Sequence, residues 1–234
     1  MRKLPAADFD GWEDFRKRNR PEPVKEGQPE GKKQRIGPEK EMPAGTDKKQ
    51  RGKNMFMEKT PVALAVLAAC AVVFILINSG PDSGRISRAV KYGCYDRALI
   101  YEGQWWRMVT VGFTHIQPWH LAMNLYALYN MSSLERYFGH SWFALLLLGA
   151  VAGGSIAEYL FSGIRWSVGL SGGLYGLMAA WLVLVLSYHW SLRGILVTIG
   201  INLVINFMPG IAWQAHLGGA VTGMLLTGLF LRLH

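Results

Sequence analysis

Charged residues are scarce in most of this 234-residue sequence. Residues 1–60 hold 16 of the 25 Lys and Arg and 11 of the 16 Asp and Glu, which leaves nine basic and five acidic residues in the other 174. A charge at the middle of a bilayer costs roughly 2.5–3.5 kcal/mol even on insertion scales, so long stretches without charge are typical of membrane-spanning segments. The charge distribution therefore argues against an ordinary soluble domain, which the 50% apolar composition alone would fit.

Cysteine is rare as well, with two residues in the whole chain. Cys70 falls in an apolar run and Cys94 in a predicted loop, so a structural disulfide between them is not expected. The spacing of cysteine and histidine is not that of a metal site. We therefore predict neither a disulfide framework nor a bound metal.

Residues 1–58 differ in composition from the rest of the chain. They are rich in Lys, Glu, Pro and Gly and contain few aliphatic residues, so they cannot bury enough apolar surface to fold alone. We predict a basic, disordered cytoplasmic tail at 1–58, followed by a membrane domain at 59–234. Basic residues near the end of the tail could contact anionic lipid headgroups. Nucleic-acid binding is not expected, because the tail lacks an aromatic-basic pattern.

Six apolar segments, each near the ~20 residues that a spanning helix needs, predict an all-α membrane protein. They lie at about 61–78, 119–137, 142–162, 171–188, 194–208 and 214–232. The basic tail predicts a cytoplasmic N-terminus, and six crossings return the C-terminus to the same side of the cell membrane. The external loop at about 79–118 carries five Lys or Arg, which mildly opposes this orientation. Its aromatic residues suit the headgroup layer.

Polar side chains open three of the predicted spans. His120 and Asn124 lie one turn apart at the start of the second span, Ser171 opens the fourth, and Gln214 and His216 open the sixth. Because these three spans run in the same direction, their first residues lie at the same external level of the bilayer. A serine becomes a nucleophile when a base takes its proton, so Ser171 and His216 together suggest nucleophilic catalysis.

Each of these residues also has an ordinary structural role open to it. A serine at a helix start is often a cap, and Asn124 could simply link helices by a hydrogen bond. What favours catalysis is the glycine pattern behind both residues, since small residues at GxxxG spacing let two helices approach closely in a bilayer. The glycines are Gly172 and Gly176 after Ser171, and Gly219 and Gly223 after His216.

The remaining parts of an acyl-transfer site have candidates too. The backbone N–H groups that begin the fourth helix, with the side chains of Asn124 and His120, could stabilise an oxyanion. Tyr175 could support the imidazole of His216 by stacking. Glu158, near the outer end of the third span, is the acidic candidate for such a site. It could complete a triad, pair with a cation such as Arg165, or serve helix packing, and we favour packing.

From about Trp105 to Gly223, the sequence resembles the rhomboid intramembrane serine proteases in their minimal six-span form. The motifs that carry the resemblance are Trp106-Arg107, His115, the His120-to-Asn124 HxxxN pair, Glu135-Arg136-Tyr137-Phe138-Gly139, the GxSG of Gly169 to Gly172, and Ala215-His216 with Gly219 and Gly223.

The resemblance implies a Ser171–His216 dyad without a third acid, which leaves Glu158 structural. It implies an oxyanion site formed by His120, Asn124 and backbone N–H groups, with Tyr175 packed against His216. It further implies a cofactor-free protease that cleaves transmembrane protein substrates near the extracytoplasmic face through an acyl-enzyme.

Two other classes of protein compete with this interpretation. A membrane chaperone or retrotranslocation factor could share the fold, but the presence of both Ser171 and His216 argues for an enzyme. A transporter is disfavoured, because the spans lack charged pathway residues and inverted-repeat breaks. Within the protease hypothesis, substrate access requires movement of the fifth span or of the external loop. The fifth span, which contains Asn202 and Asn206 and ends at Pro209-Gly210, is a candidate gate.

Overall fold

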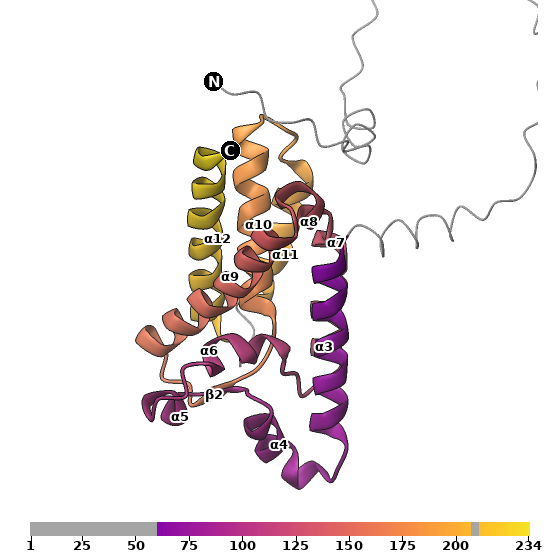
Figure 1. The fold of residues 1–234 in the computed structure, drawn as a ribbon, viewed down its shortest axis with the longest axis vertical. Coiled ribbons are helices and arrows are strands. Elements are labelled where there is room, and N and C mark those ends of the chain that lie inside the picture. The colour runs from indigo at the N-terminus through magenta and orange to yellow at the C-terminus, as the bar shows by residue number, and fades with distance from the viewer. Residues whose placement is uncertain (1–59, 207–210) are drawn as a thin grey trace, which may run out of the picture. The chain divides into compact units, whose positions relative to one another are not determined.

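A computed structural model describes residues 60–206 and 211–234, which are almost entirely helical (Figure 1). The predicted tail at 1–58 and Pro209-Gly210 lie outside the described residues. In chain order the elements are α3 (Pro61–Asn78), η1 (Asp82–Gly84), α4 (Arg85–Lys91), β1 (Tyr95–Asp96), α5 (Arg97–Tyr101), α6 (Arg107–Thr110), η2 (Val111–Phe113), α7 (Pro118–Met131), α8 (Ser133–Phe138), α9 (His140–Phe161), β2 (Trp166–Ser167), α10 (Ser171–Ser187), α11 (Arg193–Asn206) and α12 (Trp213–Leu233).

Helical structure is found at all six predicted spans. In the described part of the chain, α3, α9 and α12 are long and apolar enough to cross a membrane, and α10 is a shorter apolar helix. The prediction of one continuous helix over 119–137 was wrong, because the chain divides there into α7 and α8. The break at Ser132 lets α8 turn aside and bury Leu134, Glu135 and Phe138.

The core of the fold is formed by α9, α10 and α12, which pack against one another. Large apolar side chains fill it, including Phe143 and Leu147 of α9 and Leu177 and Leu184 of α10, all fully buried. By contrast, Ile75 of α3 and Leu225 of α12 are 64% and 69% exposed. Apolar surface of this kind on the outside of long apolar helices is suited to lipid contact rather than to water.

The N-terminus of α3 is held by a fully buried carboxylate from α8. The two oxygens of Glu135 accept hydrogen bonds from the backbone N–H groups of Val62 (2.9 Å) and Ala63 (2.8 Å), and one oxygen contacts His140 Nδ1 at 2.7 Å. The first N–H groups of a helix lack intrahelical partners, and the positive end of the helix dipole favours an anion. Glu135 therefore joins α3 to the α7–α8 region.

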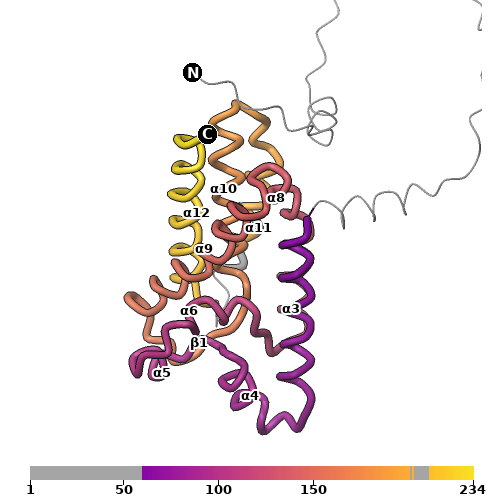
Figure 2. The backbone as a smooth tube through the Cα atoms, in the orientation of Figure 1, coloured from indigo at the N-terminus to yellow at the C-terminus, as the bar shows by residue number. Residues whose placement is uncertain are grey.

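The loop between α3 and α7 is organised around the buried guanidinium of Arg107. Its N–H groups donate to the carbonyl oxygens of Val90 (2.8 Å) and Cys94 (3.0 Å) and to Oε1 of Gln104 (2.8 Å). An antiparallel ribbon of β1 and β2 then pairs Tyr95 with Ser167, which joins this loop to the segment that precedes α10. The backbone trace follows this path from α4 through α5 and α6 (Figure 2).

Replacing Glu135 with alanine is expected to destabilise the protein. The change leaves a buried and a partly buried N–H group of α3 without acceptors, so we expect the free energy of unfolding to fall by about 2–4 kcal/mol. Thermal or SDS denaturation of the purified protein in detergent measures this loss. Glu102→Ala is the matched control, since Glu102 is an exposed acid of the same chain. Equal denaturation of both variants would contradict the role of Glu135.

Candidate active site

Ser171 and His216 lie in direct contact. Ser171 is the first residue of α10 and His216 lies in the first turn of α12, and the distance from His216 Nε2 to Ser171 Oγ is 2.8 Å. His216 is 6% exposed, so the imidazole is largely shielded from solvent. A hydroxyl that donates to an imidazole in this geometry can pass its proton to the ring as it attacks an electrophile.

Close packing of α10 on α12 produces this contact. A Cβ atom added at Gly219 would collide with the carbonyl oxygen of Gly172, and one added at Gly223 would collide with that of Gly176. The two helices therefore touch backbone to backbone along both GxxxG faces. The helix packing that the glycine spacing predicts is confirmed.

The ring of Tyr175 supports the imidazole from one side. The two rings are stacked, with centroids 4.1 Å apart and planes 7° apart. The hydroxyl of Tyr175 donates to the carbonyl oxygen of Asn202 on α11 at 2.9 Å. Tyr175 thus fixes one face of His216 and also connects α10 to the helix predicted to act as a gate.

His120 and Asn124 of α7 lie against the segment that leads into Ser171. Gly169 has φ +123°, a conformation that favours glycine, and a Cβ there would lie 2.6 Å from His120 Cε1 and 3.5 Å from Asn124 Nδ2. The side-chain donors of α7 therefore approach the backbone two residues before Ser171. Gly169 allows that approach for two reasons: glycine adopts this positive φ readily, and it has no side chain to collide with His120.

His115 has no role that follows from the sequence, although it stands among the motifs of the resemblance. It is fully buried, and its Nε2 lies 2.9 Å from Asn124 Nδ2. Burial lowers the pKa of His115 to about 3, and the charge of nearby His120 acts in the same direction. The neutral ring can accept a hydrogen bond from the Asn124 amide, so His115 orients that amide.

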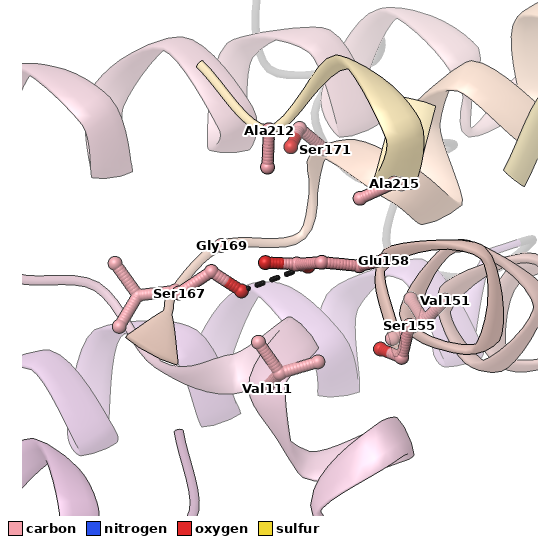
Figure 3. A pocket seen from close by; sticks show the side chains of 11 residues that line it. Val111, Val151, Ser155, Glu158, Ser167, Gly169, Ser171, Ala212 and Ala215 are labelled. Atoms are coloured by element: carbon pink, nitrogen blue, oxygen red, sulfur yellow. Dashed lines mark hydrogen bonds between the residues drawn. The ribbon is translucent and has the colours of Figure 1, made fainter. Parts of the chain in front are cut away.

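A small cavity of about 30 Å³ lies beside Ser171, with Glu158 and Ser155 of α9 in its wall (Figure 3). Oε2 of Glu158 accepts a hydrogen bond from Ser167 Oγ at 3.0 Å, and the carboxylate is 2% exposed. In the described residues, the other oxygen of Glu158 is buried without a hydrogen-bond partner. Arg165, considered from the sequence as a partner for Glu158, lines a different pocket.

The residues described here contain no group of three or more His, Cys, Asp or Glu that could hold a metal ion. Cys70 and Cys94 are both free and buried. The groups that the structure does bring together at the site are the hydroxyl of Ser171 and the imidazole of His216.

Comparison with known proteins adds to this geometry. A family model described as Rhomboid domain matches residues 102–233. The chain is 31% identical over 167 residues to Rhomboid protease GluP of Bacillus subtilis (strain 168). This match covers 67% of this chain and 32% of that protein. It is 35% identical over 157 residues to RHOMBOID-like protein 6, mitochondrial, of Arabidopsis thaliana, and 32% identical over 162 residues to RHOMBOID-like protein 1 of the same plant.

The matches to these two plant proteins cover 63% and 65% of this chain. They span 50% and 41% of the relatives' own length. The chain thus spans half or less of each of these three relatives.

A larger residue at Gly219 is expected to separate α12 from α10. In Gly219→Val the side chain meets the Gly172 carbonyl, and overpacking of this kind typically costs about 1–3 kcal/mol. We expect a lower melting temperature, measured by thermal denaturation in detergent. Gly228→Val is the control on the same helix, because a Cβ there meets nothing within 4 Å. A Gly219→Val variant as stable as Gly228→Val would contradict close packing at this point.

Proposed function

The chain belongs to the rhomboid family of membrane proteins, and we propose that it is an intramembrane serine protease. The observation that carries the proposal is the 2.8 Å contact between Ser171 Oγ and His216 Nε2. A chaperone or retrotranslocation factor of the same fold would have no need for a serine and an imidazole in hydrogen-bonding contact. The stacked ring of Tyr175 favours an enzyme further, because it holds the imidazole in one orientation.

In the proposed reaction, Ser171 attacks the carbonyl carbon of the scissile peptide while His216 Nε2 accepts the hydroxyl proton. His216 then gives this proton to the leaving amine, and the acyl group stays on Ser171. In the second half water attacks the ester carbonyl while His216 accepts a proton from it. The bond between the acyl carbon and Ser171 Oγ then breaks, His216 returns the proton to Ser171 Oγ, and the new carboxyl end is released.

The negative charge that develops on the carbonyl oxygen needs hydrogen-bond donors. The first intrahelical bond of α10 runs from Leu174 N to the Leu170 carbonyl, so the N–H groups before Leu174 have no acceptor within the helix. These groups, with the side chains of His120 and Asn124 close to Gly169, form the proposed oxyanion site. The His115 contact supports this role for Asn124, since it fixes the amide nitrogen.

Glu158 is proposed to have no direct part in proton transfer. Its hydrogen bond goes to Ser167, and its carboxylate lines the cavity beside Ser171. That cavity has room for about two water molecules. We infer that Ser171 and His216 act as a dyad, with water for the second half-reaction available from this side.

We propose six spans with both termini in the cytoplasm of a cell-membrane protein, in line with the basic tail. Under this topology Ser171 lies toward the extracytoplasmic face. The substrates would then be transmembrane proteins cut near that face, with their spans entering from the surrounding lipid. Cofactors are not needed for this reaction.

Replacing either member of the dyad is expected to abolish cleavage. Ser171→Ala and His216→Ala would each lower the rate by about 10³-fold or more, measured with a purified single-span substrate in liposomes. A fluorophosphonate probe is expected to label wild type but not Ser171→Ala. Glu158→Gln is the comparison within the same site and is expected to keep most activity. Cleavage by both alanine variants would show that the active site lies elsewhere, and complete loss in folded Glu158→Gln would favour a triad.

The stacking of Tyr175 on His216 is expected to matter more than its hydroxyl. Tyr175→Phe keeps the ring and is expected to retain activity within about threefold, whereas Tyr175→Leu loses a contact of about 0.5–1.5 kcal/mol and up to about tenfold in rate. Steady-state cleavage rates of the three proteins measure this. If Tyr175→Phe were as impaired as Tyr175→Leu, the hydrogen bond to Asn202 rather than the stack would be the important contact.

A further inference from the structure

A second pocket, of about 530 Å³, lies where the external loop meets the end of α9. Arg97 and Tyr101 of α5, Glu102 after it, Tyr159 of α9 and Arg165 beyond α9 contribute to its lining. α5 lies beside this end of α9 in the backbone trace (Figure 2). The volume lies within the range of about 300–1,000 Å³ that is common for small-molecule sites.

The two arginines give the pocket a positive character. The guanidinium of Arg97 is fixed, since its Nη1 donates to the Ser162 carbonyl at 2.8 Å and its Cζ lies 4.9 Å from the centre of the Tyr159 ring. Arg165 is exposed, and within the described residues its side chain has no hydrogen-bond or ion-pair partner. Glu102 offsets one of these two charges, so the lining carries a net charge of +1.

Exposed apolar and aromatic side chains occur in the segments that form the pocket. Leu160 and Phe161 at the end of α9 are 62% and 75% exposed, and Tyr101 is 81% exposed. The ring of Trp105 contacts that of Tyr159 edge to face, with centroids 6.1 Å apart. Tyrosine and tryptophan at the end of a spanning helix are typical of the headgroup layer of a bilayer. With α9 spanning the bilayer, as we propose, the pocket at its end would lie in the headgroup layer, where lipid phosphates are found.

We propose that this pocket binds the headgroup phosphate of an anionic phospholipid. Guanidinium groups match phosphate oxygens in charge and in hydrogen-bond geometry, and the hydroxyls of Tyr101 and Tyr159 can add donors. The exposed apolar residues at the end of α9 favour a lipid over free phosphate, because acyl chains can contact Leu160 and Phe161 on the outside of this helix. The net positive lining favours an anionic headgroup over a zwitterionic one.

Binding here joins two segments that meet near the dyad. The backbone N–H of Arg97 donates to the Arg165 carbonyl at 2.8 Å. This bond is next to the β1–β2 ribbon, since β1 ends just before Arg97 and β2 begins just after Arg165. A phosphate held by both guanidiniums adds a further link between the external loop and the segment that leads to Ser171. This binding does not depend on the chemistry proposed for Ser171.

Native mass spectrometry of the full-length protein, released from detergent with added phosphatidylglycerol or phosphatidylcholine, tests the proposal. Wild type is expected to retain phosphatidylglycerol in preference to phosphatidylcholine, and Arg165→Ala to lose about tenfold in apparent affinity for phosphatidylglycerol. Arg85→Ala is the control, because Arg85 lies outside the pocket, between α3 and α7, and pairs with Asp82. Equal retention by Arg165→Ala and wild type, or equal retention of both lipids, would overturn the proposal.

Two further measurements distinguish a lipid site from a free-anion site and from a peptide site. Without lipid, Arg165→Ala is expected to have a melting temperature within about 2 °C of wild type, since an exposed side chain without partners contributes little to stability. Arg165→Lys is expected to recover part of the phosphatidylglycerol binding. Inorganic phosphate is expected to leave the melting temperature of wild type unchanged while phosphatidylglycerol raises it. If inorganic phosphate raised the melting temperature as much as the lipid does, the pocket would be a free-anion site instead. If Arg165→Ala weakened binding of an acidic single-span peptide but left lipid binding unchanged, the pocket would be a peptide site.

Discussion

The backbone contact between α10 and α12 is the constraint on which the rest of the site depends. The carbonyl oxygens of Gly172 and Gly176 occupy the space where side chains at Gly219 and Gly223 would be. In a bilayer there is no hydrophobic force between helices, so such close approach and the dispersion contacts it creates carry much of the association. Ser171 and His216 stand at the open end of this contact, and their separation is therefore set by main-chain packing rather than by flexible side chains.

The surrounding groups follow from that arrangement. Tyr175 lies one turn after Ser171 on α10, so the same packing brings its ring onto the imidazole of His216. Gly169 leaves room on the other side for His120 and Asn124, and His115 fixes the amide of Asn124. Three helices and one loop thus meet around Ser171 and the segment that precedes it. The proposed acyl transfer requires precise alignment of its groups.

Much of this arrangement could be predicted from the sequence, because its signals are local. Apolar runs locate the helices, and the four-residue glycine spacing next to Ser171 and His216 indicates which helix faces meet. The contacts that could not be predicted join residues far apart in the chain. Glu135 reaches the start of α3 across 72 residues, and no local pattern indicates that α8 turns aside to allow it. The direction of Glu158 toward Ser167, the Asn124–His115 contact and the separate position of Arg165 likewise depend on tertiary packing.

The helices that are long enough to cross a membrane differ in length. At 1.5 Å per residue, the 18 residues of α3 span about 27 Å, whereas the 22 of α9 and the 21 of α12 span about 33 and 32 Å. A hydrocarbon layer of average thickness, about 30 Å, therefore matches neither set when the helices stand upright. Tilting can accommodate the longer helices, whereas a span as short as α3 is accommodated by local thinning of the bilayer or by flanking polar residues that reach the interface. The lipid next to α3 and the lipid next to α12 therefore meet spans of different hydrophobic length.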